Sequence, residues 1–81
     1  MAYVAKNFSV LAYANGFTLW HYKTPDTTFD VDAAGYFNAA AYMIHVGDIV
    51  LANTETGGEI RVGIWGVSSN EGGDVKTCKL L

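Results

Sequence analysis

The chain has 81 residues, a formal net charge of −3 and a pI near 5.0, and 51% of its residues are hydrophobic while only 16% are charged. This balance excludes a disordered chain, and the length allows a single domain. The five basic residues are scattered through an acidic chain, so we expect no direct binding to nucleic acid, which requires clustered Lys and Arg.

One cysteine and short apolar runs restrict the class of protein further. Cys78 is the only cysteine, which excludes an intrachain disulfide and a cysteine zinc site. The apolar stretches are far shorter than the roughly 20 residues that span a bilayer, so we expect no membrane segment. The first ten residues contain Lys6 but no hydrophobic core with a cleavage site, and they predict no export signal. We therefore expect a protein made in a reducing cytoplasm.

The chain begins with a predicted hairpin. Residues 8–14 lead into Asn15-Gly16, a pair that favours positive φ and therefore a tight turn. Residues 17–23 form the returning strand, whose apolar side chains alternate onto both faces, so we expect both faces to be partly covered. A turn is predicted at residues 24–27, where a proline fixes φ.

A change of period then predicts a helix. Asp32 is a candidate N-cap, and apolar residues recur afterwards at spacings of three to four. We expect this helix near residues 33–46, after a short extended piece at residues 28–31. Gly47 ends the predicted helix, because glycine readily adopts the left-handed conformation found after the last helical turn.

The second half predicts a meander of three strands. These are residues 49–53, 59–68 and 75–81, separated by glycine pairs at residues 57–58 and 72–73. The whole chain is therefore expected to be mainly β (α+β): a small curled antiparallel sheet or barrel of five to six short strands with one short helix. We divide it into residues 1–14, an N-terminal arm or first strand, and residues 15–81, a single small β domain.

Three aspartates could form a metal site. A calcium loop starting at Asp30 would have Asp32 at its third position, but its fifth and twelfth positions hold alanine, so the bidentate carboxylate is missing. We assign turn and helix-cap roles to Asp26, Asp30 and Asp32, and expect no metal.

The remaining candidates for chemistry are two histidines, the thiol and one aspartate. His21 and His45 lie on different predicted elements, and neither has an acidic residue at a spacing that would orient its ring. Cys78 lies in a predicted strand, and Asp48 follows Gly47 as a turn aspartate would. We expect no catalytic residues, no cofactor and no enzymatic activity.

The aromatic residues carry more information. Two tryptophans, five tyrosines and four phenylalanines exceed what one small core readily encloses, and Tyr and Trp are enriched at protein interfaces. We expect Trp20, Phe37 and Trp65 in the core, with the Trp20 strand also presenting an aromatic face to partners. The candidate interface residues are Tyr3, Phe8, Tyr13, Trp20, Tyr22 and Tyr42.

Three strings carry a family resemblance: GFTLWHYKT at residues 16–24, AGYFNAA at residues 34–40 and VGDI at residues 46–49. In this order they resemble a group of small structural proteins of tailed bacteriophages, over roughly residues 15–80. The resemblance implies a virion component, namely a head decoration (cement) protein that coats the outer surface of the capsid as a homotrimer and stabilises it. The implied partners are the major capsid protein and sister copies of the chain, and the implied site of synthesis is the bacterial cytoplasm.

A second class of function stays open. A small tail, baseplate or receptor-binding module of a phage virion would use exposed Trp and Tyr side chains to stack on sugar rings. Such a module predicts a concave aromatic cluster with Asp, Asn or Arg nearby.

Overall fold

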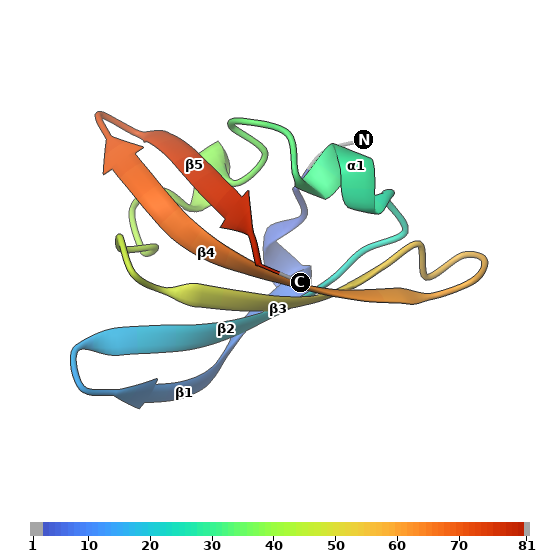
Figure 1. The fold of residues 1–81 in the computed structure, drawn as a ribbon, viewed down its shortest axis with the longest axis horizontal. Coiled ribbons are helices and arrows are strands. Elements are labelled where there is room, and N and C mark those ends of the chain that lie inside the picture. The colour runs from blue at the N-terminus through green and yellow to red at the C-terminus, as the bar shows by residue number, and fades with distance from the viewer. Residues whose placement is uncertain (1–2, 81) are drawn as a thin grey trace.

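The computed structural model describes residues 3–80, which form one five-stranded sheet with the strands in chain order (Figure 1). The predicted mainly β fold, with five strands and one short helix, is confirmed. The strands are β1 (Phe8–Ala14), β2 (Phe17–Lys23), β3 (Ile49–Thr54), β4 (Arg61–Glu71) and β5 (Asp74–Lys79).

The sheet is mixed and open, which corrects the expected antiparallel arrangement. β2 and β3 pair in parallel, whereas the other three neighbouring pairs are antiparallel. Parallel neighbours need a crossover, because the chain has to return to the same end of the sheet before the next strand. Residues 24–48 are this crossover. β1 and β5 form the two free edges, so the described strands do not close into a barrel.

All three predicted glycine turns join antiparallel strands, and two of them are two-residue hairpins. Asn15 and Gly16 have φ of 53° and 79°, and Gly72 and Gly73 have φ of 62° and 89°. These two-residue turns need positive φ at both central positions, which their residue types supply at low cost. The hairpins join β1 to β2 and β4 to β5. β1 belongs to the same sheet as the rest of the chain, so its residues form a first strand rather than a detached arm.

The helix predicted near residues 33–46 is wrong. The α-helix is α1 (Thr28–Val31), where a short extended piece was expected. The Thr27 side chain accepts a hydrogen bond from the Asp30 amide, and the Asp30 side chain accepts one from the Thr27 amide. This capping box satisfies amides that a helix start otherwise leaves unpaired. Asp32 is the C-cap of α1, not the N-cap of a later helix.

Tertiary contacts explain why the alanine-rich stretch stays irregular. Gly35 has φ of 83°, which interrupts any helix there. The Asn38 side-chain oxygen accepts a 2.7 Å hydrogen bond from the Val75 amide, and this bond ties the segment to β5. Only one 3₁₀ turn, η2 (Asn38–Ala40), forms within it.

The core lies on one face of the sheet, which we call the covered face. On this face β2, β3 and β4 place Trp20, Val50 and Trp65 in one row across the sheet. The crossover lies over that row: Figure 1 shows α1 and the rest of residues 24–48 on the same side of the strands. The buried apolar residues are Phe8, Trp20, Tyr22, Val31, Phe37, Ala40, Ile44, Val50, Ala52, Trp65, Val67 and Val75. Among the described residues, none belongs to a helix long and apolar enough to cross a membrane.

Candidate functional site

Half of the predicted interface residues are buried. Phe8, Trp20 and Tyr22 are 7%, 6% and 0% exposed, so their rings cannot meet a partner unless the chain opens. The cause is strand alternation: Trp20 and Tyr22 point to the covered face of β2, and Phe8 stacks on Trp20 with ring centroids 4.5 Å apart. The predicted core residues Trp20, Phe37 and Trp65 are confirmed as buried.

The other three predicted interface residues keep some exposure. Tyr13 and Tyr42 are 71% and 81% exposed. Tyr3 is half-buried and stacks on Tyr22 at 5.6 Å between ring centroids. Burial, and then the neighbouring Tyr42 and Tyr22 hydroxyls, raise the pKa of Tyr3. Of the six candidates, Tyr13 and Tyr42 are therefore the ones that present a full ring to solvent.

A series of hydrogen bonds fixes Val4 to the core. The Val4 amide donates to the Tyr22 hydroxyl at 2.9 Å, and Tyr36 donates to Asp26 Oδ2 at 2.7 Å. The two hydroxyls are 2.9 Å apart, and since the Tyr36 proton points to Asp26, Tyr22 donates to Tyr36. Burial, and then hydrogen bonds with Tyr22 and Asp26, raise the pKa of Tyr36. Each of the two tyrosine hydroxyls therefore donates one hydrogen bond, Tyr22 to Tyr36 and Tyr36 to Asp26.

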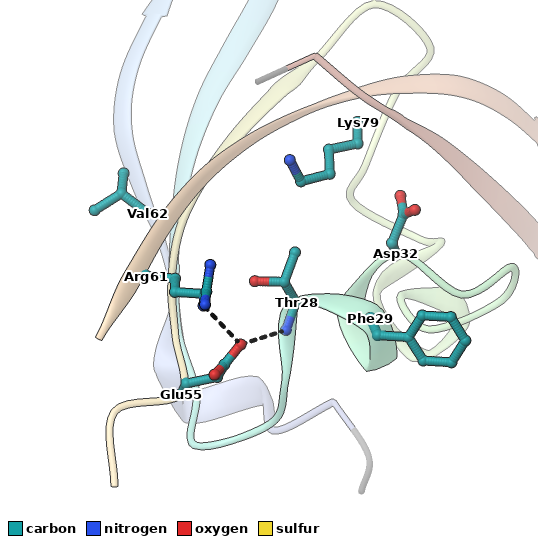
Figure 2. A pocket seen from close by; sticks show the side chains of 7 residues that line it. All are labelled: Thr28, Phe29, Asp32, Glu55, Arg61, Val62 and Lys79. Carbon is teal, nitrogen blue, oxygen red and sulfur yellow. Dashed lines mark hydrogen bonds and ion pairs between the residues drawn. The ribbon is translucent and has the colours of Figure 1, made fainter. Parts of the chain in front are cut away.

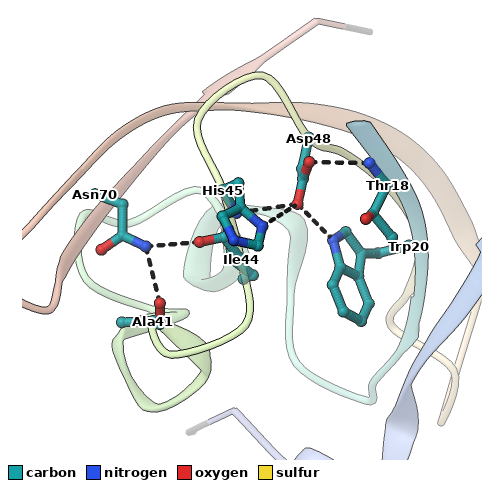
Figure 3. Close-up of polar contacts among 7 residues, drawn as sticks. All are labelled: Thr18, Trp20, Ala41, Ile44, His45, Asp48 and Asn70. Atoms are coloured by element: carbon teal, nitrogen blue, oxygen red, sulfur yellow. Dashed lines mark hydrogen bonds and ion pairs between the residues drawn. The ribbon is translucent and has the colours of Figure 1, made fainter. Parts of the chain in front are cut away.

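Asp48 is the centre of a second buried polar cluster (Figure 3). Its carboxylate is 1% exposed and accepts hydrogen bonds of 3.0 Å from the Thr18 amide, the Trp20 indole and the His45 amide. Burial by itself would raise the pKa of Asp48, but the three donors outweigh it and hold the pKa below its ordinary value. This carboxylate joins β2 to the end of the crossover.

Asn70 holds the crossover from the other side. Its amide nitrogen donates to the Ala41 and Ile44 carbonyl oxygens at 2.9 and 2.7 Å (Figure 3). These bonds satisfy carbonyl groups that no helix pairs. Asp48 and Asn70 therefore replace the helical hydrogen bonds that the sequence had suggested for this segment.

The aspartates expected at turns and helix ends are found there. Asp30 and Asp32 lie at the two ends of α1, and the Asp26 amide donates to the Thr24 hydroxyl within the predicted turn. Asp32 Oδ1 also accepts a 2.9 Å hydrogen bond from the Trp65 indole. Over residues 3–80, no group of three His, Cys, Asp or Glu is placed to hold a metal ion.

The histidines and the thiol lie apart. His21 Nε2 is 2.7 Å from the Asn53 side-chain oxygen on the neighbouring strand. His45 Nδ1 is 3.8 Å from Asp48 Oδ2, and Cys78 is exposed on β5. His21 lies on β2, His45 in the crossover and Cys78 on β5, so the three side chains do not form one site.

The opposite face of the sheet, which we call the outer face, is apolar and carries no crossover. One row of paired residues runs Ala12, Leu19, Ile49, Gly66 and Cys78 across all five strands. The adjacent row contains Ser9, His21, Leu51 and Ile64. Neither row contains Asp, Glu, Lys or Arg.

Most side chains of the outer face are partly exposed. Leu19, Ile49, Leu51 and Ile64 have intermediate exposure, and the Leu80 side chain lies beside Gly66, 3.4 Å from where a Cβ atom of that residue would be. A sheet face left to water normally has polar side chains in alternation. The sequence signal for the outer face was the apolar character of both faces of β2, and the expectation that both faces are partly covered is confirmed, since Phe17, Leu19 and His21 have intermediate exposure.

β1 is an apolar edge of the sheet, with Ala12 in a row of the outer face and Val10 in the row of Trp20. Ser9 to Ala14 are all exposed, with Val10 and Leu11 each 56% exposed, and the strand contains no charged residue. The opposite edge, β5, carries Asp74, Lys76 and Lys79. Charged side chains protect an edge strand from unwanted pairing, and β1 lacks this protection.

A polar hollow lies on the covered side, near one end of α1 (Figure 2). Its volume is about 480 Å³, and it is lined by Thr28, Phe29, Asp32, Glu55, Arg61 and Lys79 among others. Glu55 Oε2 accepts a 3.3 Å hydrogen bond from the Thr28 amide and lies 3.6 Å from Arg61 Nε. Phe29 is 85% exposed, and the sequence interpretation had given it no role.

Comparison with known proteins finds no matching family model, no matching curated protein and no matching solved structure.

Proposed function

We propose that this chain is a structural protein of a bacteriophage virion, a capsid decoration protein that binds the assembled head as a homotrimer and stabilises it. The observation that carries the proposal is the apolar outer face, because Leu19, Ile49, Leu51 and Ile64 are partly exposed there in rows that contain no charged side chain. The phage assignment itself comes from the resemblance in residues 16–49, and the outer face supports a role in contact with other proteins.

The composition of the outer face matches the anatomy of a protein interface. Its centre consists of Leu19, Ile49, Leu51 and Ile64, while Lys23 on β2 lies in the row beyond it. Stable interfaces combine an apolar centre depleted of charge with a polar rim. Contiguous apolar patches on small proteins mark sites of interaction. We assign the outer face to contact with the capsid protein.

The β1 edge supplies one of the two surfaces through which neighbouring copies in a ring-shaped assembly would meet. Each copy in a cyclic trimer uses two different surfaces, because neighbouring copies meet head to tail. The edge of β1 offers unpaired backbone groups together with the exposed side chains of Val10, Leu11 and Tyr13. We assign this edge to the contact between sister copies.

Binding alone would stabilise the shell. A ligand that binds only the assembled state lowers its free energy by RT ln(1 + [L]/Kd) at each site. A trimer that contacts several capsid subunits gains further affinity, because its second and third contacts form within one complex. No chemical step is required for this role.

The test uses undecorated shells assembled from the major capsid protein encoded by the same phage. Purified chain is mixed with the shells, unbound protein is removed by sedimentation, and the particles are imaged by electron microscopy. Light scattering gives the mass of the free protein, which we expect to be three times the chain mass. Decorated particles should withstand a higher temperature before they release their contents.

Two variants separate the outer face from general surface effects. Leu51→Lys places a charge at the centre of the outer face, and we expect it to weaken shell binding more than tenfold while circular dichroism stays unchanged. Val46→Lys is the matched control, since Val46 is 62% exposed and lies in the crossover, away from the outer face. Absence of shell binding by the natural chain, or equal binding by Leu51→Lys, would contradict the proposal.

A further inference from the structure

We propose that the hollow beside Phe29 binds a neutral carbohydrate, with the Phe29 ring as the stacking platform. The volume of about 480 Å³ lies within the range of about 300–1,000 Å³ that is usual for small-ligand sites. The inference is independent of the proposed function, because none of the residues at the centre of the outer face lines the hollow. Either could exist without the other.

The Phe29 ring projects from α1 at the border of the hollow (Figure 2). It is 85% exposed, although burying such a ring in a core would stabilise the fold by about 1.5–3 kcal/mol. α1 is fixed by the capping box of Thr27 and Asp30, so the base of the ring has a defined position. Phe29 also lines a second hollow of about 350 Å³, together with Asp30, Gly35 and Tyr36 among others. Phe29 therefore borders both hollows.

Trp20 and Trp65 cannot serve this purpose. They are 6% and 0% exposed, which corrects the expectation that a sugar-binding module would use exposed tryptophan. Tyr13 and Tyr42 are exposed as that expectation required, but neither lines this hollow, where the exposed ring is Phe29.

The polar groups around the hollow combine donors and acceptors without net charge. Asp32 and Glu55 contribute two negative charges, and Arg61 and Lys79 contribute two positive ones. Asp32 uses Oδ1 for the Trp65 indole, and its second carboxylate oxygen is free to accept from a ligand. Lys79 is exposed, with Nζ 5.9 Å from the centre of the Trp65 ring. Figure 2 shows the Glu55 and Arg61 pair on one side of the hollow and Lys79 and Asp32 across from it.

The backbone of Glu55 has an unusual conformation, which its neighbours hold in place. Its φ is 55°, in the left-handed region that residues other than glycine rarely adopt. The Glu55 amide donates to the Asp26 carbonyl at 2.9 Å, which keeps the backbone in place. Strained residues of this kind cluster at binding and catalytic sites. Here the strain directs a carboxylate to the Thr28 amide and to Arg61.

These features select the class of ligand. A phosphate or another anion would meet two carboxylates as well as two cations, so the hollow offers no net attraction for it. Hydroxyl groups both donate and accept, and therefore match a rim of carboxylates, guanidinium and ammonium. The apolar face of a sugar ring matches the exposed face of Phe29. A neutral oligosaccharide fits the balanced charge, the mixture of donors and acceptors and the exposed Phe29 ring.

The test is a titration of the ¹⁵N-labelled chain with neutral sugars, followed by amide shifts. The probes are glucose, galactose, N-acetylglucosamine and the tetramer of N-acetylglucosamine, with sialic acid and a Gly-Ser tetrapeptide for comparison. We expect at least one neutral sugar to shift the amides of Phe29, Asp32 and Val62. Phe29→Ala should weaken that binding about tenfold, which corresponds to an aromatic contact of about 1.4 kcal/mol.

Tyr13→Ala is the matched control, because Tyr13 is a similarly exposed ring, 71% against 85%, on a different element. It should leave sugar binding unchanged. The inference is refuted if no neutral sugar shifts these amides, if Phe29→Ala binds as the natural chain does, or if sialic acid or the tetrapeptide binds there more tightly than every neutral sugar.

Discussion

Replacement of Asp48 by asparagine tests whether the buried carboxylate cluster holds the crossover on the sheet. Asparagine has the same shape, but its amide nitrogen replaces one carboxylate oxygen. Asp48 Oδ1 accepts from the Thr18 amide, while Oδ2 accepts from the Trp20 indole and the His45 amide. Whichever way the new side chain turns, at least one N–H group faces another donor inside the protein.

The expected cost follows from those contacts. A hydrogen bond to a charged group contributes about 1.5–3 kcal/mol, and a buried donor left unpaired costs about 1–3 kcal/mol. Because the retained oxygen keeps part of the cluster, we expect a loss of about 3 kcal/mol. For a domain of this size each kcal/mol lowers the melting temperature by about 4–8 °C, so the variant should melt about 12–24 °C earlier.

The assay is urea unfolding of the natural chain and Asp48→Asn, followed by tryptophan fluorescence between pH 7 and pH 2.5. The pKa of Asp48 is lowered in the folded state, so its stabilisation is complete above the unfolded-state pKa of about 3.9. It is lost as the pH falls through the lower, folded-state pKa. The difference in unfolding free energy between the two proteins should therefore be constant from pH 7 to about pH 5 and shrink below about pH 4.

Asp74→Asn is the control, because Asp74 is exposed in the β4–β5 hairpin, and its effect should stay within about 0.5 kcal/mol. The reasoning is refuted if Asp48→Asn unfolds at the same urea concentration as the natural chain. It is also refuted if the difference between the two proteins does not change down to pH 2.5.

Two further substitutions test the packing of the covered face. Gly63→Ala would place a Cβ atom 2.6 Å from the buried Trp65 ring, and we expect a loss of about 1–3 kcal/mol from overpacking; Gly57→Ala, with nothing within 4 Å of its Cβ, should change the urea midpoint little. Tyr22→Phe removes the hydroxyl that accepts from the Val4 amide and donates to Tyr36. We expect faster hydrogen exchange at Val4 and a loss of about 1–3 kcal/mol, and unchanged exchange there would show that the chain is not held by this bond.

Local signals explain why the hairpins could be predicted and the helix could not. Asn15-Gly16 and Gly72-Gly73 need only their own φ preferences to form a turn, so short-range information was sufficient. The stretch around Ala39 has high helix propensity, but propensity is worth only tenths of a kcal/mol per residue. Hydrogen bonds from distant Asn70 and Val75 outweigh it.

The parallel pairing of β2 with β3 depends on contacts between distant residues. Leu19 lies beside Ile49 and Tyr22 beside Ala52, partners that no short-range pattern identifies. The same holds for the candidate sites. The aromatic count correctly indicated surplus apolar surface, but it could not show that Tyr22 is buried while Phe29 is exposed. Which side chains are buried was decided by register, and register is set by the sheet as a whole.

The crossover of residues 24–48 places most of the irregular backbone above one side of the sheet (Figure 1). Irregular segments tolerate insertion and exchange far better than paired strands do. A protein attached to a lattice through its strands would hold that irregular segment outward, so its exterior could diversify while the docking geometry stayed the same. The fold thus places its regular strands and most of its irregular backbone in two different layers.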